Sequence, residues 1–128
     1  MIKGEHINKL ITTYLPAFEG RITPLFTTRI DVDSIVYFIK AIDNEPVSQI
    51  QLEIRLICAD YDDSELFSKQ ITDIFTTNEN KKAVTVDEIS FRAGLGGGGT
   101  LFRDDLQMYE NTMFFNLKVK TKEEKTNE

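Results

Sequence analysis

VSQIQLEIRLICA, residues 47–59, is the stretch that decides the fold. From Ile50 to Cys58 every second side chain is apolar, and Gln, Glu and Arg side chains lie between the first four of these apolar residues. Successive side chains of a strand point to opposite faces of a sheet, so this alternation predicts a long strand with one packed and one solvated face. We expect the packed face to consist of Ile50, Leu52, Ile54, Leu56 and Cys58.

Four further segments are rich in β-branched and aromatic residues, which favour strands. Residues 25–31 (LFTTRID) and 34–42 (SIVYFIKAI) precede a DNEP turn at 43–46, and residues 84–93 and 107–120 lie in the last third of the chain. In the final strand we expect one face to be formed by Tyr109, Met113, Phe115, Leu117 and Val119.

Helical spacing appears twice. Near the amino terminus an apolar stripe ends at Pro16, because the residue before a proline is disfavoured in the helical region; the stripe consists of Ile7, Leu10, Ile11, Tyr14 and Leu15. The second helix falls within residues 60–78, where Asp62 and Glu65 have the spacing of a capping box. Its expected buried face is Leu66, Phe67, Gln70, Ile71, Ile74 and Phe75.

A chain of 128 residues has the size of one domain. The elements follow the order α-β-β-β-α-β-β, and no repeat or linker divides them. We therefore predict a single α+β domain over residues 1–121, with a mostly antiparallel sheet and two helices packed on one face. The polar ending, residues 122–128, has no apolar anchor, and we expect it to be disordered.

Composition restricts the classes of partner. The formal net charge is -6 and the pI about 4.8, which argues against binding nucleic acid through its phosphates. No apolar run is long enough for a membrane span, and no signal peptide is recognisable, so we expect a cytosolic protein without membrane contact. The lone Cys58 lies in the alternating strand and is expected to be a buried thiol.

The sequence GLGGGG at residues 94–99 matches a dinucleotide-binding fingerprint through Gly94, Gly96 and Gly99. That fingerprint requires a following helix whose amino terminus receives the pyrophosphate. Residues after Gly99 alternate like a strand, so we expect no nucleotide there. Four consecutive glycines instead predict a mobile connection between two strands, one that becomes ordered when it meets a partner.

Candidate catalytic groups are sparse. Asp60, Asp62 and Ser64 have the spacing of early calcium ligands, but the required glycine and bidentate glutamate are absent, so helix capping explains these acids better. His6 is the single histidine and stands on the terminal helix. We therefore predict no enzyme activity, no cofactor and no metal site.

The order of these elements resembles a known family. INKLITTYLP (7–16), the strand at 47–59, ELFSKQITDIF (65–75) and the aromatic YENTMFFNLKVK (109–120) look like the tail terminator and minor capsid, or head-tail joining, proteins of long-tailed bacteriophages. The resemblance extends to about residue 121 and rests on arrangement rather than on a diagnostic motif.

The resemblance implies a protein that is monomeric in solution and forms a ring, a hexamer, on the end of the tail tube. The ring stops tube polymerisation and offers the surface that joins the head, so the expected partners are further copies, the tail tube protein and a head-completion or connector protein. DNA would only pass through an acidic lumen. The expected location is the head-proximal end of the tail, and the host cytoplasm before assembly.

Within that expectation, the assembly loop is formed by Gly94, Leu95, Gly96, Gly97, Gly98 and Gly99 together with Arg103. Two other functions remain open from the residues alone. One is a small bacterial adaptor that recognises a peptide at a sheet edge. The other, less favoured, is a nucleotide-binding enzyme.

Overall fold

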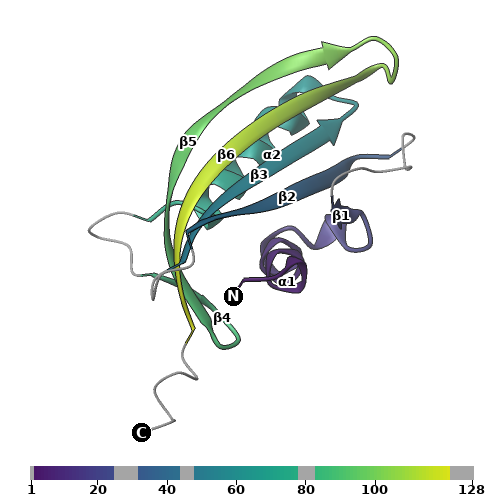
Figure 1. Cartoon of the computed structure of the whole chain (residues 1–128). Helices are drawn as coiled ribbons and strands as arrows, with labels where there is room; N and C mark the ends of the chain where they lie inside the picture. Colours follow the sequence, from purple (N-terminus) through teal and green to yellow (C-terminus); the bar gives the residue numbers. More distant parts are fainter. Residues whose placement is uncertain (1, 25–31, 44–47, 78–82, 122–128) are drawn as a thin grey trace, which may run out of the picture.

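A computed structural model describes residues 2–24, 32–43, 48–77 and 83–121. Along the chain these form two α-helices, a short 3-10 helix and six strands (Figure 1). Their bounds are α1 Gly4–Tyr14, η1 Pro16–Phe18, β1 Ile22–Pro24, β2 Ser34–Asp43, β3 Ser48–Cys58, α2 Tyr61–Ile74, β4 Val84–Val86, β5 Ile89–Arg103 and β6 Met108–Thr121.

All six strands belong to one sheet, in the order β1-β2-β3-β6-β5-β4. Each neighbouring pair is antiparallel except β1 with β2, which is parallel. The predicted α+β class with a mostly antiparallel sheet and two helices is confirmed. The predicted strand at 25–31 and the tail at 122–128 lie outside the described residues.

One predicted strand is in fact a hairpin. The segment 84–93 turns back on itself at Asp87 and Glu88, so that β4 pairs with the first residues of β5. Asp87 has a positive φ of 52°, a conformation that Asp tolerates better than most residues. An acidic pair between two apolar runs was the signal for this turn.

The alternation in β3 is confirmed. Its five predicted core side chains, Ile50 to Cys58, are at most 1% exposed. They face Leu117, Phe115 and Met113 of β6 in register. The buried side chains of β3 and their partners on β6 form the middle of the hydrophobic core.

Helix α1 ends where Pro16 predicts, and Leu15 donates its backbone N–H to the Ile11 carbonyl at 2.7 Å. Its Ile7, Leu10 and Ile11 are buried. Tyr14 was expected in that buried stripe but is 63% exposed, because it lies in the last turn, at the border of a surface pocket.

Helix α2 begins two residues earlier than the predicted capping box requires. The cap is Asp60, whose side chain accepts a hydrogen bond from the Asp63 backbone N–H at 2.9 Å, and not Asp62. Ile71, Ile74 and Phe75 are buried as predicted, whereas Leu66 is 53% exposed. The helix packs against the core mainly through its second half, so the predicted apolar face includes a residue of the first half, Leu66, that lies largely in solvent.

Both helices pack on the same face of the sheet, because buried residues of α1 and α2 share one core with Ile35, Phe91 and Phe115 of the sheet. We call this the helix-covered face. The other face, which we call the open face, carries Val36, Phe38 and Lys40 of β2 and their register partners on β3, β6 and β5. Among the described residues, no helix is long and apolar enough to cross a membrane.

Candidate assembly interface

The polyglycine segment is part of a strand, and the predicted mobile connection is wrong. Gly97, Gly98 and Gly99 pair with Phe114, Met113 and Thr112 of β6. The chain turns later, at 104–107, where Gln107 has a positive φ of 56°. Glycine has no side chain, so a run of glycines shows none of the alternation that identifies a strand. The segment is nevertheless ordered, because its backbone forms the hydrogen-bonded ladder with β6.

A bulge in this segment shifts the alternation of β5. Register slips by one residue between Leu95 and Gly97. Before the bulge, Phe91 and Ala93 face the helices; after it, Phe102 takes that face and Leu101 and Arg103 lie on the open face. The glycines therefore decide which side chains of the distal hairpin each face presents.

Gly98 is the position where glycine is required. A Cβ built there would overlap the Thr112 carbonyl oxygen of β6, whereas one at Gly99 would meet nothing within 4 Å. We expect Gly98→Ala to lower the free energy of unfolding by about 1–3 kcal/mol, because backbone atoms must move. Gly99→Ala is the matched control, expected to change it by less than about 1 kcal/mol. Urea titration of both variants measures the difference, and equal stabilities would contradict this packing.

Beyond the bulge, β5 forms an open edge of the sheet. β4 pairs only with Ile89–Phe91, and Thr77 covers Ala93, whose N–H donates to the Thr77 Oγ1 at 3.0 Å and whose carbonyl accepts from the Thr77 N–H at 2.8 Å. From Leu95 to Arg103 no described residue pairs with the outer side of β5. An edge of this kind is a template for strand pairing.

On the other side of the sheet, β2 forms a second edge that is open as far as the described residues extend. β1 pairs with β2 only as far as Tyr37, so the rest of β2 has no described partner on its outer side. Both edges carry apolar side chains in solvent. Of the eight large apolar residues that are exposed among the described ones, five are on these two edges: Phe38 and Ile42 on β2, and Leu95, Leu101 and Phe102 on β5.

Charged side chains fix the end of the β5–β6 hairpin. Arg103 contacts Asp105 at 2.7 Å and Glu110 at 3.4 Å, and Glu110 also lies 3.8 Å from Arg55. The hydrogen bond to Arg103 lowers the pKa of Asp105, and the Asp105 carboxylate raises the pKa of Arg103. Arg103 was predicted as part of an assembly loop. In the structure its ion pairs join the turn at 104–107 to β6.

Aromatic rings form a partly exposed row beside the same hairpin end. Tyr109 lies edge-to-face against Tyr61 of α2 and Phe102 of β5, with ring centroids 5.4 Å and 5.0 Å away. The hydrogen bond to Glu65 raises the pKa of Tyr61. This row anchors the distal hairpin to the start of α2, and its Phe102 end reaches the open edge.

A possible metal cluster joins α1 to the β4–β5 turn. His6, Asp87 and Glu88 present their ligand atoms within 4.8 Å of one another. However, the His6 Nδ1 accepts a hydrogen bond from the Lys3 N–H at 2.8 Å, so the neutral ring carries its proton on Nε2 and donates it to Glu88 at 3.2 Å. Asp87 pairs with Lys9 at 2.6 Å. Both histidine nitrogens form hydrogen bonds within the protein. The cluster therefore links α1 to the β4–β5 turn and is not arranged as a cation site.

Two other predicted features have a clear position. Cys58 is fully buried as expected, and burial raises the pKa of its thiol to about 12, which disfavours the nucleophilic thiolate. After Gly99 the chain continues through a turn into β6, and no helix follows to receive a pyrophosphate. The structural context of a dinucleotide fingerprint is therefore absent from residues 94–121.

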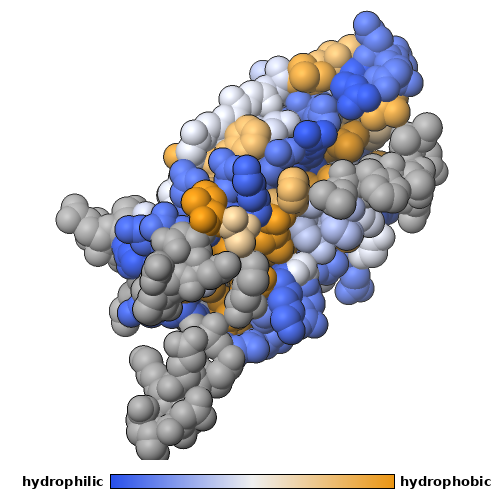
Figure 2. Space-filling view, viewed as in Figure 1, coloured by the Kyte–Doolittle hydropathy of each residue, from blue (hydrophilic) through white to orange (hydrophobic). Residues whose placement is uncertain are grey.

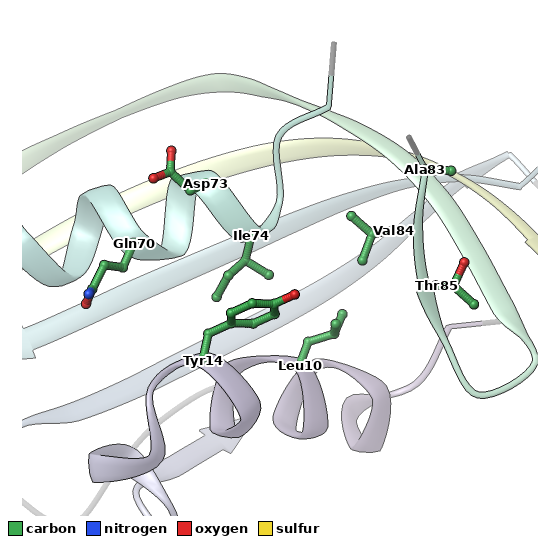
Figure 3. A pocket seen from close by; sticks show the side chains of 8 residues that line it. All are labelled: Leu10, Tyr14, Gln70, Asp73, Ile74, Ala83, Val84 and Thr85. Atoms are coloured by element: carbon green, nitrogen blue, oxygen red, sulfur yellow. The ribbon is translucent and has the colours of Figure 1, made fainter. Parts of the chain in front are cut away.

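A pocket of about 570 Å³ separates α1, α2 and β4, and sequence reasoning missed it. Figure 2 shows hydrophobic residues gathered in the middle of this side of the molecule, where Figure 1 places the two helices. In Figure 3, Tyr14, Leu10, Ile74 and Val84 approach one another, while Asp73 points away from them. Asp73 is the one carboxylate among the eight described lining residues, and none of them is a histidine or cysteine. The pocket is suited to an apolar group rather than to acid–base chemistry.

No protein-family model and no curated protein sequence matches the chain. Its fold is similar to that of a chain in a solved structure described as the virion of a native gene transfer agent particle. The two chains are 8% identical, with a TM-score of 0.62, and the likeness covers 90% of this chain and 95% of that chain. This protein therefore shares its fold, over nearly its whole length, with a chain of a gene transfer agent virion.

Proposed function

We propose that this protein is a structural component of a phage-like virion, a tail terminator that closes the end of the tail tube. It is a monomer in solution and assembles as a ring, a hexamer, at the head-proximal end of the tail. The fold shared with a chain of a gene transfer agent virion supports the virion setting. The order of elements along the sequence supports the particular station.

The observation that carries assembly is the pair of open edges. β5 beyond Leu95 and β2 beyond Tyr37 lie on opposite sides of one sheet, and each exposes large apolar side chains. Pairing β5 of one copy with β2 of the next buries both edges. Because the two surfaces differ, the contact is head-to-tail, and repeated rotation closes it into a ring.

The glycine-rich segment also leaves room for a neighbouring copy above the sheet. Gly97 and Gly99 are in register with Phe114 and Thr112 of the open face, and a Cβ at either glycine would meet no atom within 4 Å, so the segment presents bare backbone on that face. The edge is ordered by β6 before any partner arrives. Assembly in this proposal needs no folding of a loop, and the tube end acts by bringing copies together at high local concentration.

The partners of such a ring are further copies of the chain, the tail tube protein on one side and a head-completion or connector protein on the other. DNA passes through the lumen during packaging or ejection. Before assembly the protein resides in the host cytoplasm.

Electron microscopy tests the function directly. The purified protein is incubated with tail tubes polymerised from the tube protein of the same phage or prophage, and the tube ends are imaged. We expect a ring at one end of each tube and an arrest of further polymerisation. Tubes that elongate unchanged and remain bare at both ends would contradict the proposal.

The second candidate is an adaptor that adds a peptide strand to the open edge of β5. The same unpaired segment, Leu95 to Arg103, favours it. Size-exclusion chromatography with multi-angle scattering, with and without tail tubes, separates the two functions. An adaptor remains monomeric and never enters the tube fraction, whereas a terminator co-sediments with the tubes.

A further inference from the structure

The open face is cationic although the whole chain is acidic. Among the described side chains, six cations and two carboxylates lie on it, an excess of four positive charges on a chain of formal net charge -6. In contrast, α2 and its cap Asp60 carry five carboxylates and one lysine. The cations of the open face are Lys40, Arg55, Arg92, Arg103, Lys118 and Lys120, and its carboxylates are Glu53 and Glu110.

The carboxylates and the cations of the open face are unevenly distributed along the strands. Arg55 and Arg103 lie near the hairpin end and are paired with Glu53 and Glu110. Arg92, Lys118 and Lys120 lie at the opposite end, where Arg92 is in register with Lys118. All three are exposed. We call this second region the cationic end.

The cationic end contains a hollow of about 310 Å³. Its described lining consists of two cations, Arg92 and Lys118, and the amide of Asn116, with Thr77, Ala93 and Gly94 as the remaining walls. None of the described residues that line it carries a carboxylate. A hollow bordered by positive charges and hydrogen-bond donors matches the chemistry of a phosphate group.

The surroundings favour nucleic acid over protein as the occupant. Interfaces between proteins contain an apolar centre with aromatic or aliphatic anchors. The exposed side chains at the cationic end are instead lysine, arginine and amides, including Gln49 in register with Lys118. Phosphate backbones are contacted by this set of side chains. Lys118 and Lys120 are two residues apart on β6, which spaces them about 7 Å along one face.

We propose that the cationic end of the open face binds the phosphate backbone of double-stranded DNA. Contact is made by Lys118, Lys120 and Arg92, with Asn116 and Gln49 as hydrogen-bond donors. The binding is independent of sequence, because phosphate contacts carry no base information. The net charge of the whole chain does not indicate this site, because the alternation of side chains along the strands places the basic residues together on one face. The inference stands apart from ring formation and applies to the isolated chain.

Fluorescence anisotropy with a short labelled DNA duplex tests it. Lys118→Ala/Lys120→Ala is compared with Lys69→Glu, which lowers the net charge by the same two units but changes an exposed residue of α2. We expect the double variant to lose about tenfold in affinity at low salt, and the slope of log affinity against log salt to fall by about two. Lys69→Glu is expected to bind like the native protein.

Three results would overturn the proposal. The native protein fails to bind the duplex at low salt; or Lys69→Glu weakens binding as much as the double variant, which makes the effect one of net charge; or poly-L-glutamate binds at the cationic end and DNA does not, which assigns the face to an acidic protein. Ring formation on tail tubes is measured separately for the double variant. Loss of DNA binding with rings retained is the expected outcome and separates this site from the assembly edges.

Discussion

Lysine in place of Leu95 or Leu101 is expected to prevent ring formation on tail tubes. Both leucines lie on the open edge of β5 and are 53% and 52% exposed. Pairing with a neighbouring strand would take a charged ammonium group out of water, which costs several kcal/mol per subunit contact. Because a closed ring repeats each contact around its circumference, the loss multiplies. Tube-end occupancy counted in micrographs measures the effect, and the two substitutions combined should leave tube ends bare.

Leu66→Lys is the matched control. Leu66 is also 53% exposed, but it lies on α2, away from both edges. The same substitution there adds the same charge and should leave rings intact. All three variants should unfold within about 0.5 kcal/mol of the native protein, because each changes an exposed side chain. Rings that survive Leu95→Lys/Leu101→Lys would show that assembly uses another surface.

Phe75→Ala is expected to destabilise the fold more than any exposed substitution. Phe75 is fully buried at the end of α2, with ring centroids 6.1 Å from Phe91 and 5.5 Å from Phe115. Removing it leaves a cavity between the helix and the two long strands. We expect a loss of about 3–5 kcal/mol in the free energy of unfolding. Urea denaturation measures the loss.

The comparison for that experiment is Phe38→Ala, since Phe38 is 45% exposed on the open edge of β2. Its loss of stability should be well below that of Phe75→Ala, because much of its surface is already in water. Similar losses for the two variants would mean that α2 does not cover the sheet as described.

The sequence predicted those elements whose side chains alternate between water and core. In β3, and in β6 apart from Asn111, apolar side chains recur at every second position of the packed face, and these faces were identified almost residue by residue. Helix ends were recovered where backbone chemistry forces them, as at Pro16. The capping residue of α2 was displaced because Asp60 and Asp62 both have a suitable side chain, and only the local backbone selects between them.

The segment that we propose as an assembly interface was singled out from the sequence, but its strand structure was not predicted. The glycine-rich residues 94–99 were recognised as exceptional, yet consecutive glycines show no alternation, so the pairing of this segment with β6 could not be recognised. The bulge that follows Leu95 is invisible for the same reason. The open edges and the cationic end depend on strand order and on which faces meet the helices, and both are tertiary properties that local spacing does not encode.

A cryo-electron microscopy map of the protein bound to tail-tube ends tests strand-to-strand assembly most directly. It should show a sheet that continues from copy to copy, with β5 of each subunit hydrogen-bonded beyond Leu95 to β2 of the next. A ring whose subunits meet through α1 or α2, with the polyglycine edge of β5 left in solvent, would contradict it.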